Sequence, residues 1–371
     1  MRLILLIYLL LPMGYVSKSN AQSANTALPA DGLQAVIDKA VDQKKVFGVA
    51  FGIKKNGQEW HGQAGNFEDA APFFIGSTTK LFTTALIMKL RAEGKLSLDD
   101  FIYRYLDEAT IQGLHVYKGE DHSKRIQIRH LLAHTSGLPD YFQGKNQNGS
   151  SLEERLTLGN DSNWTFNQAI EGSKSMSPLF APGTKGKAHY SDTNFQLLGK
   201  IIEALTAKSY AENVETHLIR PLGLTETYLY TDAEDRKPKV LYFKDKPLEV
   251  YQAMASFGPD GGMVSTTSDL LAFGEAFFGG KLFPTAYLAE MQEWNSIFFP
   301  LESGIGIHRF KLPWVFNPTG AVPPLIGHSG LSGALLFYSP KDGALLAGTV
   351  NQVAHPDISF RVMIKLLQKA K

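Results

Sequence analysis

The sequence predicts a mixed fold of the α/β (α+β) class, in which both ends of the chain complete one β-sheet around a mostly helical insertion. Near the start, an Asn-Gly turn at Asn56 joins an apolar, strand-like segment to the second strand of a predicted hairpin. Near the end, two more predicted strands span 334–338 and 344–350, whereas the signals between residue 81 and about residue 300 are mostly helical. Strands at both ends with helices between them indicate one folding unit rather than two domains in series.

The first residues have the features of a secretory signal. Arg2 precedes an apolar run at 3–11, and small residues end the segment at Ala21. The run is too short for a membrane anchor, which needs about 20 apolar residues. We therefore expect a signal peptide at residues 1–21, export to the periplasm or the medium, and no stable membrane anchor afterwards.

The remaining elements follow from local patterns. A helix with one apolar face is predicted from Leu33, Val36, Ile37, Ala40 and Val41. Segments 46–53 and 59–64 form the hairpin around Asn56, and a last helix spans 358–367. Loops are expected at 144–151, 160–163 and 233–247, and we expect the wider segments 144–163 and 295–324 to shape a substrate pocket.

The composition excludes several classes of function. The 371 residues are 44% hydrophobic and 20% charged, with a net charge of +1 that becomes about −1 once residues 1–21 are removed. No dense basic run offers a surface for nucleic acid or anionic membrane. Because the chain has no cysteine, thiol catalysis, thiolate metal sites and disulfides are excluded.

The segment from Pro72 to Leu90 carries the first catalytic motif. Its apolar positions recur at helical spacing, which predicts a buried helix with Ser77 in its first turn and Lys80 on the same face. A lysine there can reach the serine hydroxyl, and the free N–H groups of a helix N-terminus can stabilise an oxyanion. This is the S-x-x-K arrangement of acyl-transferring serine enzymes, although Ser77 could equally cap a structural helix.

Two further stretches could supply partners for Ser77. Tyr190 stands at the head of Tyr-Ser-Asp-Thr-Asn-Phe, and its phenol becomes a base if a neighbouring cation such as Lys80 favours the phenolate. Residues 327–333 are rich in glycine and serine, as the backbone beside an oxyanion hole must be. Each stretch alone also fits a structural role.

Other polar groups carry weaker signals. His130 and His134 stand at helical spacing, but Leu131 occupies the position where a H-E-x-x-H metalloprotease needs its glutamate, so we interpret both histidines as structural. The pairs at 99–100 and 153–154 are interpreted as solvated or capping carboxylates. No metal and no cofactor is expected.

In combination these motifs resemble the class C β-lactamase, penicillin-binding protein and D-aminopeptidase family of serine hydrolases. The resemblance runs from about Leu33 to the C-terminus, and further phrases typical of that family are Leu131–Leu138, Arg220–Tyr228 and Gly261–Phe273. It implies a β-lactamase/transpeptidase-like fold over 28–371, with an antiparallel sheet flanked by helices and a mostly helical subdomain.

The resemblance also implies roles for individual residues. Ser77 would attack a carbonyl to form an acyl-enzyme, Lys80 and Tyr190 would move the proton, and water would release the acyl group. The oxyanion hole would be the N–H groups of Ser77 and Leu331. The substrate-binding segment would be His328, Ser329 and Gly330, with Asp192 of the tyrosine motif.

Two residues depart from the β-lactamases of that family. Asp192 stands where they have asparagine, and a carboxylate near Lys80 would raise the pKa of that amine and weaken it as a base. His328 stands where penicillin-recognising members have lysine, and a neutral imidazole is a poorer anchor for a substrate carboxylate.

We therefore expect an exported serine hydrolase that cleaves an ester or a D-amino-acid amide. Its substrate would be a small molecule or a peptide, for example one derived from the cell wall. One alternative is a true β-lactamase or D-Ala-D-Ala carboxypeptidase, which shares the mechanism. A second is a catalytically silent binding module of the same fold, which Asp192 suggests.

Overall fold

The hairpin predicted around Asn56 starts the central sheet. The computed structural model describes residues 27–67, 71–146 and 148–371. Asn56 and Gly57 have φ angles of 52° and 76°, the left-handed values that a tight two-residue hairpin turn requires. The turn joins strand β1 (Gly48–Lys55) to strand β2 (Gln58–Gly65).

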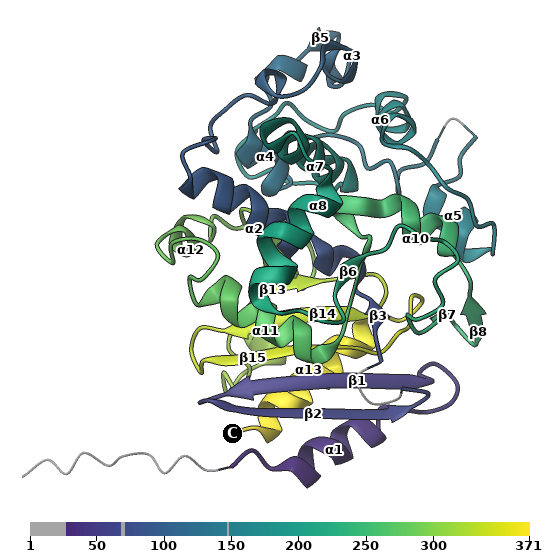
Figure 1. The fold of residues 1–371 in the computed structure, drawn as a ribbon, viewed down its shortest axis with the longest axis vertical. Coiled ribbons are helices and arrows are strands. Elements are labelled where there is room, and N and C mark those ends of the chain that lie inside the picture. The colour runs from purple at the N-terminus through teal and green to yellow at the C-terminus, as the bar shows by residue number, and fades with distance from the viewer. Residues whose placement is uncertain (1–26, 68–70, 147) are drawn as a thin grey trace, which may run out of the picture.

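Both ends of the chain contribute to one antiparallel sheet, as predicted (Figure 1). Strand β15 pairs with β1, so that Thr349 lies opposite Ala50. Across the sheet the other strands run in the order β10 (Asn295–Phe298), β11 (Leu301–Ser303), β12 (His308–Phe310), β13 (Leu325–Ser329), β14 (Ala334–Ser339), β15 (Ala344–Thr349), β1 and β2.

The two faces of the sheet are covered by different helices because successive side chains of a strand point to opposite faces. Val49 and Ile53 of β1 are buried against α1 (Ala30–Asp38) and α13 (Asp357–Lys369). On the other face α11 (Thr267–Phe278) packs closely, because Gly52 has no side chain where a methyl group would lie 2.8 Å from Leu271. Helix α13 confirms the C-terminal helix that was predicted at 358–367.

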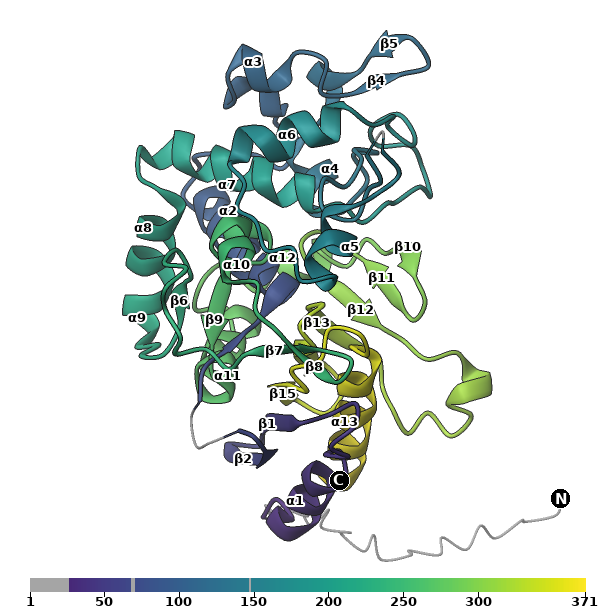
Figure 2. The same cartoon turned by 90° about the vertical axis from the view of Figure 1, so that its right-hand side faces the viewer.

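A mostly helical half lies beside the sheet, as Figure 2 shows. Its central helices α2 (Thr79–Ala92) and α7 (Asp192–Thr206) share one hydrophobic core with the inner face of the sheet. The shorter helices are α3 (Glu108–Ile111), α4 (Ile128–Leu132), α5 (Leu152–Thr157), α6 (Phe166–Lys174), α8 (Tyr210–Val214), α9 (Arg220–Leu222), α10 (Tyr251–Phe257) and α12 (Tyr287–Glu290).

Small sheets connect the two halves. Strand β9 (Met263–Ser265) pairs with β3 (Phe73–Phe74) and with β6 (Tyr228–Leu229). Two hairpins, β4 (Val116–Tyr117) with β5 (Glu120–Asp121) and β7 (Leu241–Phe243) with β8 (Lys246–Leu248), complete the strands. Among the described residues, no helix is both long and apolar enough to cross a membrane.

Several predicted boundaries were wrong. The expected loop at 233–247 contains β7 and part of β8, and the expected loop at 295–324 contains three strands of the main sheet. These strands have three or four residues each, too few for a periodic pattern, and pairing with distant segments defines them. The first helix ends at Asp38, because Asp42 accepts the N–H groups of residues 44–46 and forms a turn instead.

Candidate active site

Ser77 lies in a single 3-10 turn, η1 (Gly76–Thr78), which links β3 to α2. The α-helix begins at the residue after η1, Thr79, so Ser77 lies in the opening turn of the helical segment, as expected, but this turn is 3-10 rather than α-helical. Gly76 has a φ of 51°, a conformation that favours glycine, and this allows the chain to turn sharply out of the strand. The turn presents the serine hydroxyl at the N-terminal end of a buried helix.

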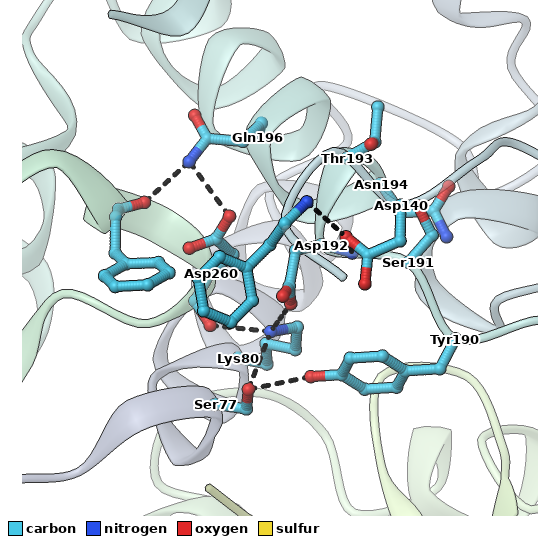
Figure 3. A network of polar contacts seen from close by, with 12 residues as sticks. Ser77, Lys80, Asp140, Tyr190, Ser191, Asp192, Thr193, Asn194, Gln196 and Asp260 are labelled. Atoms are coloured by element: carbon cyan, nitrogen blue, oxygen red, sulfur yellow. Dashed lines mark hydrogen bonds and ion pairs between the residues drawn. The ribbon is translucent and has the colours of Figure 1, made fainter. Parts of the chain in front are cut away.

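The structure brings Ser77, Lys80 and Tyr190 into hydrogen-bond contact (Figure 3). The Tyr190 hydroxyl donates to the Ser77 Oγ at 2.8 Å, and the Lys80 Nζ donates to the same oxygen at 3.2 Å. Two donors on one hydroxyl oxygen stabilise negative charge that develops on it during nucleophilic attack. The contacts are compatible with a nucleophilic role for the serine oxygen.

Lys80 is fully buried and is held as a cation. Its Nζ also donates to the Asp192 Oδ1 at 2.5 Å and to the backbone oxygen of Asp260 at 2.6 Å. Burial works against the charged amine, but the charge of Asp192, with smaller contributions from Tyr190 and Asp260, raises the pKa of Lys80 above its ordinary value. This is the direction expected from Asp192 in the sequence.

Tyr190 differs from the expectation. The sequence suggested that the Lys80 cation would favour its phenolate, whereas burial, followed by the charge of Asp192, raises the pKa of Tyr190 and outweighs the opposing effect of Lys80. Tyr190 is therefore a neutral phenol in the resting site. The charge of the ion pair is already balanced within the pair, so little cationic field is left to stabilise a phenolate.

Two more carboxyl groups surround the ion pair. The Asp140 Oδ1 accepts the backbone N–H groups of Phe142 and Asp192, and the Asp260 Oδ2 accepts hydrogen bonds from Tyr141 and Gln196. Burial, followed by repulsion from Asp192, raises the pKa of Asp140 well above its ordinary value and that of Asp260 to about 8. The cluster therefore holds one cation, one carboxylate and two carboxyls that favour the neutral form.

On the other side of Ser77, three imidazoles surround Tyr190. His134 stacks on the phenol ring at 4.5 Å between centroids, and its Nδ1 accepts the backbone N–H of Ser191. His308 and His328 stack on each other at 3.9 Å. Burial lowers the pKa of all three imidazoles, so they are neutral.

These positions refine the histidine expectations. His328 has the neutral imidazole that the sequence suggested, but only 1% of it is exposed. His134 is structural in the sense that it fixes the tyrosine loop, yet it touches a candidate catalytic group. His130 accepts the backbone N–H of Gln127 at the start of α4. Among the described residues, no group of three or more histidines or carboxylates could hold a metal ion.

The candidate oxyanion donors, the backbone nitrogens of Ser77 and Leu331, lie on adjacent segments. A methyl group on Gly330 would lie 2.9 Å from the Ser77 nitrogen, and one on Gly76 would lie 3.5 Å from the Leu331 nitrogen. Glycine at position 330 therefore permits the close approach of β13 to η1. An acyl oxygen between these two nitrogens would meet two backbone donors.

Two cavities meet at Ser77. An apolar one is lined by side chains of α5, β7, β8 and α10, among them Leu241, Leu248 and Met254. A second one is lined by more polar groups, including Gln143, Tyr190, His308, Ser329 and Gly330. Ser77, Asp192 and Leu331 line both cavities. No lysine or arginine lines either cavity among the described residues.

Sequence reasoning missed Asp140, Asp260 and His308. Asp140 lies two residues after the Leu131–Leu138 phrase and Asp260 directly precedes the Gly261–Phe273 phrase, so the flanks of these phrases could have indicated both. His308 lies on β12, a three-residue strand whose pairing no local pattern reveals. The carboxylates at 99–100 and 153–154 largely fit their predicted roles, since Glu154 caps α5, although Glu153 also lines the apolar cavity.

Comparison with known proteins agrees with this geometry. The family model described as Beta-lactamase matches residues 33–362. A penicillin-binding protein of Bacillus subtilis (strain 168) is 28% identical over 276 residues, which cover 70% of this chain and 55% of that protein. The matched regions span only 37–65% of the first three curated relatives.

Solved structures show the same architecture. A D-stereospecific amidohydrolase from Streptomyces sp. superimposes with a TM-score of 0.72 at 26% identity, covering 90% of this chain and 97% of that one. A D-amino acid amidase from Ochrobactrum anthropi SV3 shares the fold, with a TM-score of 0.74 at 22% identity and coverage of 91% and 99%.

Proposed function

We propose that this chain, which belongs to the Beta-lactamase family and is a serine hydrolase, cleaves an ester or a D-amino-acid amide through an acyl-enzyme on Ser77. The observation that carries the proposal is the pair of hydrogen bonds that the Ser77 Oγ accepts from Lys80 and Tyr190 where two cavities meet. A nucleophile with a proton carrier, a fixed cation and two nearby backbone N–H groups is the set that acyl transfer needs.

The division of labour follows from the contacts. Ser77 attacks the carbonyl carbon, while Lys80 remains a cation that stabilises the developing negative charge. Tyr190, whose neutral hydroxyl contacts the Ser77 Oγ, accepts the serine proton while its own proton passes to the leaving group, so it is a neutral phenol before and after the step. The raised pKa of Tyr190 means that proton transfer is easier at alkaline pH, where the phenolate is more populated.

The cavities support a substrate without a carboxylate beside the scissile bond. Penicillins, cephalosporins and D-Ala-D-Ala peptides carry such a carboxylate, and it is best anchored by an ammonium or guanidinium group. The described lining of both cavities has neither, and its ionisable groups include Glu153, Asp192 and Asp260. The large apolar wall suits a bulky apolar acyl group or side chain.

A substrate panel tests this proposal. Purified protein would be given a short-chain ester, a D-phenylalanine amide, a cephalosporin and a D-Ala-D-Ala peptide. We expect kcat/KM to be highest for the ester or the amide. Preference for the cephalosporin or the peptide would instead support the β-lactamase or carboxypeptidase alternative, and reversible binding without turnover of any substrate would support the silent binding module.

We also propose that the protein is exported. The signal pattern at residues 1–21 lies outside the described residues, so its support is the sequence itself together with the relationship to penicillin-binding proteins. Expression of the full chain in a bacterial host, followed by mass analysis of the extracellular and periplasmic fractions, should yield a product that begins at Gln22. An uncleaved product retained in the cytoplasm would contradict export.

A further inference from the structure

His308 is a buried imidazole without the hydrogen bonds that such a group needs. Only 2% of the residue is exposed, and neither ring nitrogen has a hydrogen-bond partner among the described residues. The two neighbouring imidazoles differ, since the Nδ1 of His134 and the Nδ1 of His328 both contact backbone groups. Buried polar atoms are rarely left unpaired, so a partner for His308 is expected from the cavity that it lines.

The surroundings of His308 fix its ring in place. The residue begins β12 opposite Gly327 of β13, and its ring is held between His328, at 3.9 Å, and Tyr190, at 5.9 Å between centroids. It lines the polar cavity together with Ser77 and Tyr190. A group bound to His308 would therefore lie in the same cavity as the serine oxygen and the phenol.

The reaction assigns this cavity to the leaving group and to water. Tyr190 lines the polar cavity and is not among the residues that line the apolar one. If Tyr190 carries the proton to the departing group, that group leaves on the polar side, and the water that replaces it enters there. The apolar cavity then retains the acyl group.

Several other polar groups near Ser77 are already engaged. Three hydrogen bonds from the Lys80 Nζ go to Ser77, Asp192 and Asp260. The Tyr190 hydroxyl donates to Ser77, and the side-chain amide of Gln143 donates to Glu153. His308 differs from these groups because neither of its ring nitrogens has a hydrogen-bond partner among the described residues.

We propose that His308 binds the water molecule that hydrolyses the acyl-enzyme; this inference rests on the proposed acyl-enzyme at Ser77. The water oxygen attacks the acyl carbonyl carbon, and one water proton passes to the Tyr190 oxygen while the proton already on Tyr190 passes to the Ser77 Oγ. The bond between the carbonyl carbon and the Ser77 Oγ breaks, the remaining hydroxyl of the water completes the acid product, and Tyr190 is again a neutral phenol. His308 holds the water by a hydrogen bond and ends the step unchanged.

Burial supports this neutral role. It lowers the pKa of His308 to about 3, so the imidazole keeps one lone pair as acceptor and one N–H as donor throughout the neutral and alkaline range. Accepting a hydrogen bond from the water would leave a lone pair of the water oxygen free to face the acyl carbon.

The test separates deacylation from acylation in His308→Phe, which keeps an aromatic ring in the stack and removes both nitrogens. With a p-nitrophenyl ester in stopped flow, we expect the burst of nitrophenol to keep its rate and amplitude while the steady-state rate falls roughly tenfold or more. Intact-mass analysis should show the acyl adduct persisting. Equal losses in burst and steady state, or no loss in either, would overturn the proposal.

Two controls make the result specific. His115→Phe changes another buried imidazole, away from the described site, and should leave the ratio of burst to steady-state rates unchanged. His308→Gln keeps a polar side chain and should retain more deacylation than His308→Phe. If His308→Phe does not fold, His308→Gln alone decides: its deacylation constant must fall by more than its acylation constant, and equal losses refute the role.

This design also separates the two proposals. Absence of any adduct on the wild-type protein would refute the acyl-enzyme itself. A normal adduct on the wild type together with unchanged deacylation in His308→Phe would refute only the assignment of the water to His308.

Discussion

Ionisable groups are buried on both sides of Ser77, but their surroundings differ in kind. On one side, three carboxyl groups surround the single ammonium of Lys80, and each of the three accepts at least one hydrogen bond. On the other side, three imidazoles surround the single phenol of Tyr190, and contacts between rings predominate. Charge is thus confined to the carboxyl side.

This difference separates two tasks that acyl transfer requires. A permanently charged pair can stabilise negative charge near the serine oxygen but is poorly suited to exchanging protons, because each ion favours the charged form of the other. A neutral, closely packed group of rings can hold a phenol in a fixed direction and leaves it free to transfer its proton. We therefore assign charge stabilisation to the carboxyl side and proton transfer to the imidazole side.

The largest expected effect comes from Tyr190→Phe, which leaves the ring stack in place and removes the hydroxyl that contacts Ser77. Loss of a positioned proton carrier should lower the acylation rate by about 10²–10⁴-fold, with little change in thermal stability. Single-turnover kinetics with a chromogenic ester would measure it. Full activity in this variant would assign proton transfer to the carboxyl side and contradict the assignment of that task to the imidazole side.

The next effect concerns the charge of Asp192. This charge raises the pKa of both Lys80 and Tyr190, so Asp192→Asn should lower both values and make either basic form available at lower pH. We expect the rising limb of kcat/KM against pH to move down by roughly one pH unit or more.

Asp140→Asn is the matched control for this shift. The pKa of Asp140 lies well above its ordinary value, so the carboxyl favours its neutral form and the substitution removes little charge, while an amide oxygen can still accept the two backbone N–H groups. Its pH profile should stay close to that of the wild type. A shift to higher pH in Asp192→Asn, or equal shifts in both variants, would contradict the assigned charges.

The smallest effect is on stability. Because the pKa of Asp260 is raised to about 8, its contribution to stability is fully present below the ordinary carboxyl pKa and is lost as the pH rises through about 8. Asp260→Asn is neutral at every pH and should gain stability relative to the wild type between about pH 5 and about pH 9. Thermal unfolding of the wild type and of Asp260→Asn at about pH 5 and about pH 9 measures this gain in stability, and Asp245→Asn, which changes an exposed residue, serves as the control. If the stability difference between Asp260→Asn and the wild type were the same at both pH values, the raised pKa of Asp260 would be refuted.

The same comparison shows what sequence could predict. Ser77 and Lys80 lie three residues apart, and Tyr190 and Asp192 share one motif, so local spacing indicated them as candidates and the family resemblance implied their roles. The direction of the Tyr190 pKa could not be predicted, because it depends on burial and on how far Asp192 neutralises Lys80. His308 and Asp260 reach the site from segments distant in the chain, and only the folded sheet and helices bring them to Ser77.

In the fold, helices and strands with long sequence patterns were predicted, whereas strands of three or four residues were not. The first hairpin and the last helix carry their own turn and periodicity signals, and both form as expected. Strands β10–β12 have three or four residues each and exist because β13 offers an edge for pairing. His308 lies on β12, which is one of these short strands. The region that sequence reasoning described least well therefore includes one wall of the polar cavity.

The most direct test of the central claim is intact-protein mass spectrometry after a rapid quench with a p-nitrophenyl ester. The wild-type protein should gain the mass of one acyl group, peptide mapping should place it on Ser77, and Ser77→Ala should gain nothing. An identical adduct on Ser77→Ala, or turnover of the ester by that variant at the wild-type rate, would contradict the acyl-enzyme on Ser77.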